Sequence, residues 1–212
     1  MTNQLIGNQI SIYNKENKNS MNYLVREACL MKEIRFHGRG GQGVVKSAQI
    51  LVETVVEGGL YAHFIPFFGV ERKGSPVFGF LRIDDKEIRV KCQVYHPEVL
   101  MVFDDTLLNL PQTFLGLVDH GVVIINTEKT VESLPLPEKP MKVFSINATG
   151  IALERFKKPI PNTAMLGAFA KATGWVNWQI LQEKIRLAFN NDNALAAIDA
   201  YENVQLVKQE EF

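Results

Sequence analysis

Residues 33–57 read EIRFHGRGGQGVVKSAQILVETVVE, and this run joins a strand pattern, a cluster of glycines and a helical pattern. Glu33–Phe36 is extended in character, whereas apolar residues recur every three or four positions through Gln42–Glu57. Gly58 and Gly59 follow at once, and glycine commonly ends a helix. The run therefore predicts a strand, a tight glycine turn and a helix.

The rest of the chain alternates short apolar runs with helical ones. The further predicted strands are Ala62–Phe67, Val99–Phe103, Val122–Ile125 and Lys142–Ile146. The further predicted helices are Thr149–Phe156, Thr163–Thr173, Trp178–Ala188 and Asn193–Ala200. This alternation predicts an α/β domain with a Rossmann-like, mostly parallel sheet and helices on both faces.

One part of the pattern departs from this alternation. Val77–Ile83 and Lys86–Lys91 are two extended runs separated only by Asp84 and Asp85, so we expect an added antiparallel hairpin. In open α/β sheets, ligands bind beyond the carboxyl ends of the strands. We expect the glycine loop Gly38–Gly43 at that edge.

The composition indicates one globular domain. The chain has 212 residues, 46% of them hydrophobic and 22% charged, and its formal net charge is zero. No basic excess indicates a nucleic-acid partner, and no apolar run approaches the roughly 20 residues of a spanning helix. We predict a single domain over residues 31–212, preceded by a polar extension or arm over residues 1–30.

The two cysteines, Cys29 and Cys92, exclude some chemistry for the chain alone. An iron–sulfur cluster normally takes four cysteine thiolates, and no histidine pair has the spacing of a helical metal site. Few cysteines suggest a reducing compartment, so we expect a cytoplasmic protein that binds no metal by itself. Cys92 follows an apolar run, which predicts a buried thiol. No nucleophile–base pair stands out, so no catalytic residue is assigned.

The glycine loop is the first candidate site. Gly38, Gly40 and Gly43 satisfy G-x-G-x-x-G between a strand and a helix, where free N–H groups attract anions. An NAD site places an acidic residue about 20 positions on, and Tyr61–Phe68 contains none. The candidate ligand contacts are Gly38, Arg39, Gly40, Gly41, Gln42 and Gly43. A turn that serves packing alone is the alternative.

A second candidate is the charged loop within Phe67–Val77, which is either an interaction surface or a solvated turn. Asp104 and Asp105 follow a buried strand, and we prefer to interpret them as a helix N-cap. Trp175 and Trp178 flank a turn and are either core residues or an oligomer contact.

Three runs in this order resemble the gamma subunit of 2-oxoacid:ferredoxin oxidoreductases. They are HGRGGQGVVKSAQIL (residues 37–51), FGVERKGSPVFGFLRID (residues 68–84) and NTAMLGAFAKATG (residues 162–174). The resemblance covers about residues 32–205, and the E-R-K-G-S-P-V run is most similar to the pyruvate branch. It implies a subunit that is inactive alone, in an enzyme that converts a 2-oxoacid to acyl-CoA and passes electrons to ferredoxin or flavodoxin.

The resemblance also implies where the cofactors lie. Thiamine diphosphate with Mg²⁺ and the iron–sulfur clusters belong to other subunits, which are the expected partners, and coenzyme A (CoA) binds on or between subunits. The phosphates of CoA suit a helix N-terminus. The alternatives are a stand-alone, dehydrogenase-like nucleotide-binding protein and a scaffold subunit that binds no ligand.

The family motif is carried over position by position. The glycines shape the loop, and Arg39 and Gln42 are expected to face the ligand or a partner. Lys73 stands where the pyruvate branch usually has arginine, and lysine keeps the positive charge but not the bidentate geometry. The other expected ligand or partner contacts, besides Lys73, are Glu71, Arg72, Gly74, Ser75, Asn162 and Thr163.

Overall fold

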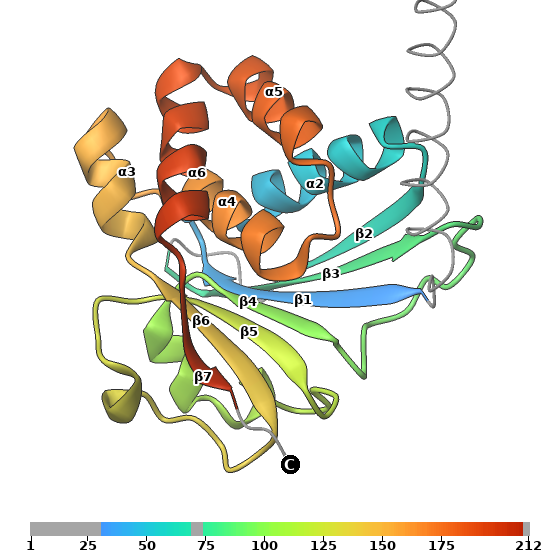
Figure 1. Ribbon diagram of the computed structural model, residues 1–212. Helices are drawn as coiled ribbons and strands as arrows, with labels where there is room; N and C mark the ends of the chain where they lie inside the picture. Colours follow the sequence, from blue (N-terminus) through green and yellow to red (C-terminus); the bar gives the residue numbers. More distant parts are fainter. Residues whose placement is uncertain (1–30, 69–73, 210–212) are drawn as a thin grey trace, which may run out of the picture. The chain divides into compact units, whose positions relative to one another are not determined.

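The computed structural model describes residues 31–68 and 74–209 (Figure 1). Its centre is a seven-stranded sheet with strand order β2-β3-β1-β4-β5-β6-β7. The strands are β1 (Lys32–Arg39), β2 (Tyr61–Phe68), β3 (Pro76–Asp84), β4 (Val99–Val102), β5 (Gly121–Asn126), β6 (Met141–Ile146) and β7 (Gln205–Gln209).

Four neighbouring strands, β1, β4, β5 and β6, are parallel. All four residues of β4 are fully buried, and five of the six residues of β5 are buried. Parallel strands of this kind need cover on both faces, which explains the continuous runs of valine, isoleucine and leucine. The predicted α/β class with a parallel centre is confirmed.

The antiparallel hairpin lies elsewhere than predicted. β3 pairs with β1 on one side and with β2 on the other, so its partner in the hairpin is Tyr61–Phe68. Lys86–Lys91 forms no strand, and the prediction for this run was wrong. Both edges of β3 are already occupied, so no ladder is left for the segment that follows it.

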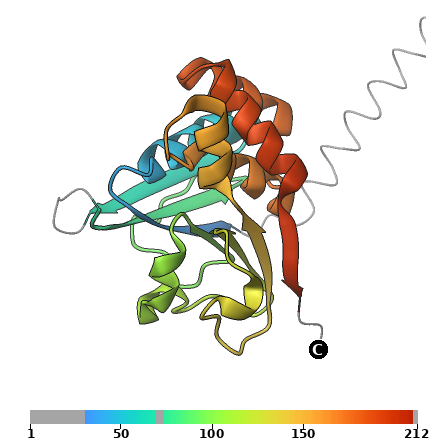
Figure 2. The same cartoon turned by 90° about the vertical axis from the view of Figure 1, so that its left-hand side faces the viewer.

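Five α-helices cover one face of the sheet (Figures 1 and 2). They are α2 (Val44–Glu57), α3 (Ala148–Phe156), α4 (Asn162–Thr173), α5 (Trp178–Ala188) and α6 (Asn191–Asn203). The other face carries short 3₁₀ helices, which are η1 (Asp105–Asn109), η2 (Pro111–Thr113) and η3 (Val131–Ser133). The predicted α-helices are confirmed, and both faces are covered by different kinds of helix.

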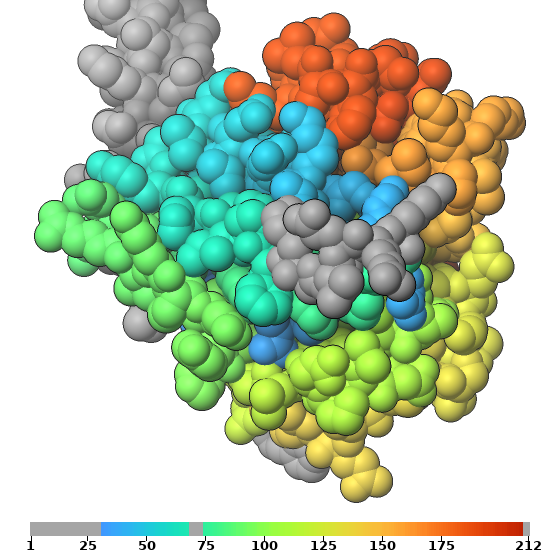
Figure 3. Space-filling model, turned by 180° about the vertical axis from the view of Figure 1, so that it is seen from behind, coloured from blue at the N-terminus to red at the C-terminus, as the bar shows by residue number. Residues whose placement is uncertain are grey.

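Each face of the sheet has its own apolar core. The larger core lies under the α-helices and includes Phe36, Phe103 and Phe169. The smaller one lies under the 3₁₀ helices and includes Leu107 and Val123. Seen from behind, α2 and β2 lie side by side (Figure 3).

Helix α4 is the central helix of its layer. Every residue from Asn162 to Ala170 is buried. Its contacts with α6 advance in the same direction along both helices, from the pair Thr163 and Asn193 to the pair Gly167 and Ala197. The two helices are therefore parallel, and their N-termini lie at the same end.

The tryptophans pack within the domain. Trp175 meets Phe169 edge to face, and Trp178 stacks on Tyr201 with ring centroids 4.4 Å apart. Both indole side chains are half-buried. These contacts favour the core interpretation of the two residues.

Cys92 is exposed, so the prediction of a buried thiol was wrong. The segment after β3 runs over the surface because it does not join the sheet. The expectations for the extension over residues 1–30 and for Glu71, Arg72 and Lys73 fall outside the described residues. None of the described helices is long and apolar enough to cross a membrane.

Candidate functional site

The glycine loop connects β1 to α2 and is shaped by close contacts. A Cβ on Gly38 would lie 2.3 Å from Val44 Cγ2, so no larger residue fits there. Gly43 precedes the first residue of α2 and has φ of 77°, a left-handed conformation that favours glycine. Gly41 has φ of 99°. These glycines allow the chain to turn directly from strand to helix.

Two polar side chains of the loop turn toward Asp104. Arg39 Nε and Gln42 Nε2 each donate to Asp104 Oδ2 at 3.1 Å. Gln42 Oε1 also accepts a hydrogen bond of 2.7 Å from the backbone N–H of Arg39. The loop is therefore held in shape by its own side chains. Contact of Arg39 and Gln42 with a ligand stays a prediction.

Asp104 caps the 3₁₀ helix η1, which confirms the N-cap interpretation. Its carboxylate accepts from the backbone N–H of Thr106 at 3.1 Å and from the hydroxyl of the same residue. Partial burial raises the pKa of Asp104, but the bonds from Thr106 and the Arg39 guanidinium outweigh it and hold that pKa below its usual value. Asp104 is therefore a fixed negative charge that organises the loop.

The second candidate loop meets the first one. The Gly40 N–H donates to the Ser75 carbonyl at 3.0 Å, and the Gly74 N–H donates to the Gly40 carbonyl at 3.3 Å. Arg39 Nη1 donates to the Gly74 carbonyl at 3.1 Å. The described members of two sequence motifs, Gly40 and Gly74–Ser75, are thus brought together.

The third motif completes the cluster. Asn162, the first residue of α4, lies so close to Gly43 that an added Cβ there would be 2.8 Å from Asn162 Cβ. Ser47 Oγ on α2 is 3.3 Å from the Asn162 carbonyl oxygen. Thr163 is fully buried, and its hydroxyl lies 3.4 Å from Asn193 Oδ1. Asn162 therefore belongs to the glycine-loop site. Thr163 is buried between α4 and α6 and does not line the site.

Two helix N-termini in this cluster differ from the other three. The first turns of α3, α5 and α6 each have an asparagine cap, from Asn147, Asn177 and Asn190. The residues that precede α2 and α4, Gly43 and Pro161, provide no side-chain cap, and neither helix has an acidic residue in its first turn. An anion at this place would meet the positive ends of two helix dipoles.

Comparison with known proteins decides the family. Residues 33–207 match the family described as Pyruvate ferredoxin/flavodoxin oxidoreductase. The chain belongs to this family.

Individual relatives agree with this assignment. The chain is 49% identical over 182 residues to the pyruvate/ketoisovalerate oxidoreductases common subunit gamma of Pyrococcus furiosus, covering 83% of this chain and 98% of the relative. It is 47% identical over 179 residues to the pyruvate synthase subunit PorC of Methanothermobacter marburgensis, covering 82% and 98%. The match spans nearly the whole length of both relatives.

A solved structure supports the fold directly. The pyruvate oxidoreductase subunit PORC of Thermotoga maritima is 35% identical and superposes with a TM-score of 0.72. The superposition covers 82% of this chain and 97% of that protein. The sheet and helices described above are therefore those of a family member.

The cofactors of such an oxidoreductase can be tested against the residues of this family member. A four-thiolate cluster does not fit, because the described ranges contain one cysteine, Cys92, and the whole chain has two. Within those ranges, no three His, Cys, Asp or Glu side chains are grouped to hold a metal ion. The donors at Gly43 and Asn162 suit a phosphate.

Two features of this domain were not found from the sequence. One is that Asp104 accepts hydrogen bonds from Arg39 and Gln42 of the glycine loop. The only sequence signal for this was the position of Asp104 directly after a buried strand. The other is a buried pair on β1, in which Arg35 Nε donates to His37 Nε2 at 3.0 Å. The alternation of Arg35 and His37 places both on one face of the strand, a signal that was available but not used.

Proposed function

We propose that this chain is the gamma subunit of a 2-oxoacid:ferredoxin oxidoreductase whose substrate is pyruvate. The enzyme would decarboxylate the 2-oxoacid, transfer the acyl group to CoA and pass two electrons to ferredoxin or flavodoxin. Family membership over residues 33–207 carries this proposal. The chain would act only within the complex.

Pyruvate is supported by the relatives. One is named as common to pyruvate and ketoisovalerate oxidoreductases, and another is a pyruvate synthase subunit. A subunit common to two enzymes cannot select between their substrates. We therefore assign the choice of 2-oxoacid to the thiamine-binding subunits.

We assign the contact with CoA to the glycine loop and the start of α4. Its support is the meeting of two uncapped helix N-termini at Gly43 and Asn162, where backbone N–H groups favour phosphate oxygens. Arg39 and Gln42 would maintain the loop geometry through Asp104. These hydrogen bonds hold the glycine loop in one conformation, which is what a preformed phosphate site requires.

The strand order disfavours the alternative of a stand-alone NAD enzyme. In a dinucleotide fold, the ribose acid ends a parallel strand beside the first one. Here β3 runs antiparallel to β1 and occupies that place, and β2 lies one strand further out. Tyr61–Phe68 has no acidic residue in any case.

The remaining parts of the enzyme would belong to partners. We place thiamine diphosphate, Mg²⁺ and the iron–sulfur clusters on other subunits, because the cysteines of this chain do not suffice for a cluster. Such an enzyme would work in the cytoplasm, where its ferredoxin or flavodoxin acceptor is reduced.

The experiment is a pull-down of this chain from its native lysate. The eluate is assayed for CoA-dependent reduction of a viologen dye with pyruvate, 2-oxoisovalerate, 2-oxoglutarate and indolepyruvate. Partners that carry thiamine diphosphate and iron, with the highest rate on pyruvate, are the expected result. The proposal would be contradicted if the eluate contained no partners and showed no activity, and if the purified chain bound NAD(P).

A further inference from the structure

The outer edge of β2 is open. β2 is the last strand on its side of the sheet, and β3 is the strand that pairs with it in residues 31–68 and 74–209. An edge strand of this length is a template for pairing with another strand. Proline is tolerated where its nitrogen faces away from the paired neighbour, so the backbone groups of Ala62, Phe64 and Pro66 point outward. Ala62 and Phe64 therefore present N–H donors at this edge.

Apolar side chains flank the edge on both faces of the sheet. On the face covered by the α-helices, a groove of about 640 Å³ lies between α2 and β2, and Val45, Val52 and Phe64 are among the residues that line it. On the other face, Tyr61 is 50% exposed and Phe67 is 49% exposed. Figure 3 shows α2 and β2 together on one surface of the molecule. Exposed apolar side chains beside an open edge are typical of an interaction surface.

The aromatic residues of β2 are placed symmetrically about Phe64. Phe64 packs edge-on against Phe36 in the core beneath the α-helices. Tyr61 and Phe67 lie three positions before and after it, so both face the other side of the sheet. If two β2 strands pair antiparallel about a two-fold axis at Phe64, Tyr61 of one copy lies directly opposite Phe67 of the other. Cross-strand aromatic pairs of this kind are favourable.

The same axis passes the middle of α2. A glycine turn joins α2 directly to β2, so the two elements run in opposite directions. Phe64 is about 13 Å along β2 from Leu60, and Gln49 is about 13 Å back along α2 from Gly58, given rises of about 3.3 and 1.5 Å per residue. Both Phe64 and Gln49 line the groove. A two-fold axis at Phe64 would therefore bring two α2 helices together near Gln49.

The charges of α2 suit this arrangement. Lys46 and Glu53 lie at nearly equal distances on either side of Gln49. In two antiparallel helices, Lys46 of one copy would then face Glu53 of the other, and the reverse. Neither side chain takes part in an ion pair within the described ranges, where Lys184 pairs with Glu57 instead. The α2 surface is therefore complementary in charge to a second copy of itself.

We propose that the α2–β2 edge joins two copies of this chain about a two-fold axis at Phe64, with one sheet continuous across both copies. A two-fold interface requires a patch that is complementary to itself, and both the aromatic and the charged pairs meet this requirement. Phe64 exchanges backbone hydrogen bonds with its own copy, and the Ala62 N–H donates to the Pro66 carbonyl of the second copy. The inference goes beyond the proposed function and does not depend on it.

Cysteine cross-linking of the full chain tests the register, in a Cys29→Ser/Cys92→Ser background. Tyr61→Cys and Phe67→Cys are made as separate variants and mixed under mild oxidation. The mixture should form a disulfide between the two chains, because directly opposite residues lie within disulfide distance. Neither variant should link alone, since two copies of position 61 would be about 20 Å apart. No disulfide in the mixture, or equal linking of either variant alone, would overturn the inference.

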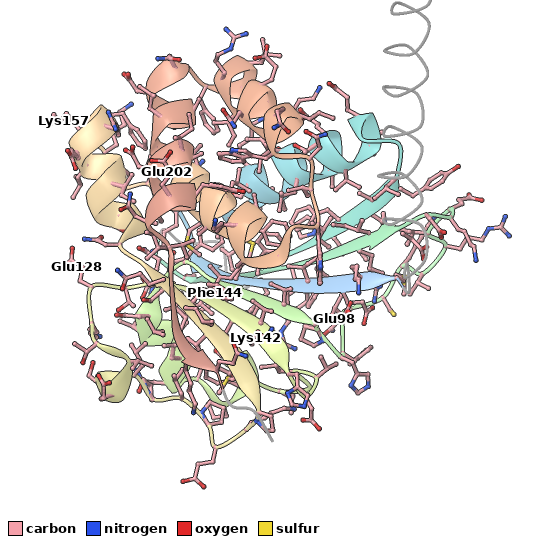
Figure 4. The ribbon with its side chains drawn as sticks, viewed as in Figure 1. Glu98, Glu128, Lys142, Phe144, Lys157 and Glu202 are labelled. Carbon is pink, nitrogen blue, oxygen red and sulfur yellow. The ribbon has the colours of Figure 1, made fainter. Side chains whose placement is uncertain are left out.

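Charge reversal tests the contact between the helices. Lys46→Glu and Glu53→Lys should each weaken self-association at least about tenfold in sedimentation equilibrium, because each change places like charges together twice in a symmetric interface. The double variant should restore it. Lys142→Glu on β6 and Glu202→Lys on α6 are the matched controls at exposed positions, and both should associate as the wild type does (Figure 4). Equal weakening by the controls, or a double variant no better than the single ones, would overturn the inference.

The assembled complex distinguishes a second copy from another kind of subunit. A photoreactive cross-linker attached to the cysteine of Tyr61→Cys should capture a second copy of this chain. Capture of a different subunit would show that the α2–β2 edge serves that partner, and it would overturn the inference. None of these readouts involves CoA or a 2-oxoacid, so their failure is distinct from a failure of the proposed function.

Discussion

Gly43 and Asn162 are in direct contact where α2 and α4 begin, and no room for a side chain remains between them. A Cβ at Gly43 would be 2.8 Å from Asn162 Cβ and 2.8 Å from Asn162 Nδ2. The contact links the first and third motifs of the sequence, which are more than 100 positions apart. It fixes the distance between two uncapped helix N-termini.

Gly43→Ala tests this contact. The left-handed φ of 77° and the clash with Asn162 should together lower the free energy of unfolding by about 2–4 kcal/mol. Gly59→Ala is the matched control, because Gly59 has φ of 86° but no atom within 4 Å of its added Cβ. It should cost about 1 kcal/mol. If both variants lost the same free energy of unfolding in urea, the contact between Gly43 and Asn162 would contribute nothing to stability.

Gly167→Ala tests the packing of the two parallel helices. Helix propensity alone predicts a gain of about 1 kcal/mol, since alanine is the better helix former. The added Cβ would, however, lie 1.9 Å from the Ala197 carbonyl oxygen, which is backbone and cannot rotate away. We expect a net loss of about 2 kcal/mol in urea unfolding. A more stable variant would refute close α4–α6 packing.

His37 should make stability depend on pH. Burial, and then the nearby Arg35 guanidinium, lower the pKa of His37 to about 3, whereas the unfolded chain titrates near 6.5. Below about pH 6.5 the unfolded state takes up a proton that the folded state refuses, so stability falls with falling pH until about pH 3. His37→Gln keeps an acceptor for Arg35 and removes this dependence.

The measurement is urea unfolding of both proteins at pH 6.5 and pH 5. Between these values the wild type should lose about 1.6 kcal/mol more than His37→Gln, because the slope rises from half to nearly all of about 1.4 kcal/mol per pH unit. His96→Gln, at an exposed bend outside the strands and helices, is the control for the substitution itself. Parallel pH curves for wild type and His37→Gln would mean that His37 is protonated in the folded state.

Asp104→Asn tests the organiser of the glycine loop. The pKa of Asp104 is lowered in the folded state, so its contribution to stability is present above about pH 4 and is lost as pH falls through the folded-state pKa. The variant should therefore be less stable than wild type at pH 7, and the difference should shrink below pH 4. In the complex, its KM for CoA should rise while kcat is kept. A constant difference in stability at every pH would contradict a charged carboxylate.

The sequence alone located the strand, loop and helix at Lys32–Glu57, because all the required signals are local there. Glycine spacing, a 3.6-residue period and a terminal glycine pair all agree. The same local rules failed for Lys86–Lys91, since the partner of β3 was decided by competition from β1 and β2. Cys92 was misplaced for the same reason.

The site was predictable only in part. Its motifs could be named from the sequence, but their meeting depends on the contacts of Gly40 with Ser75 and of Gly43 with Asn162. No spacing rule gives such distances. The role of Asp104 requires Arg39, Gln42 and Thr106 to converge from two segments, which only the tertiary structure shows.

The most direct test of the central claim is the KM for CoA of complexes that carry Asn162→Asp or Asn177→Asp. Both changes add one negative charge at a helix N-terminus, but only Asn162 lies at the proposed phosphate site. The account predicts that Asn162→Asp raises the KM for CoA at least about tenfold in pyruvate-dependent viologen reduction, and that Asn177→Asp leaves it unchanged. An assembled Asn162→Asp complex with an unchanged KM for CoA would contradict the account.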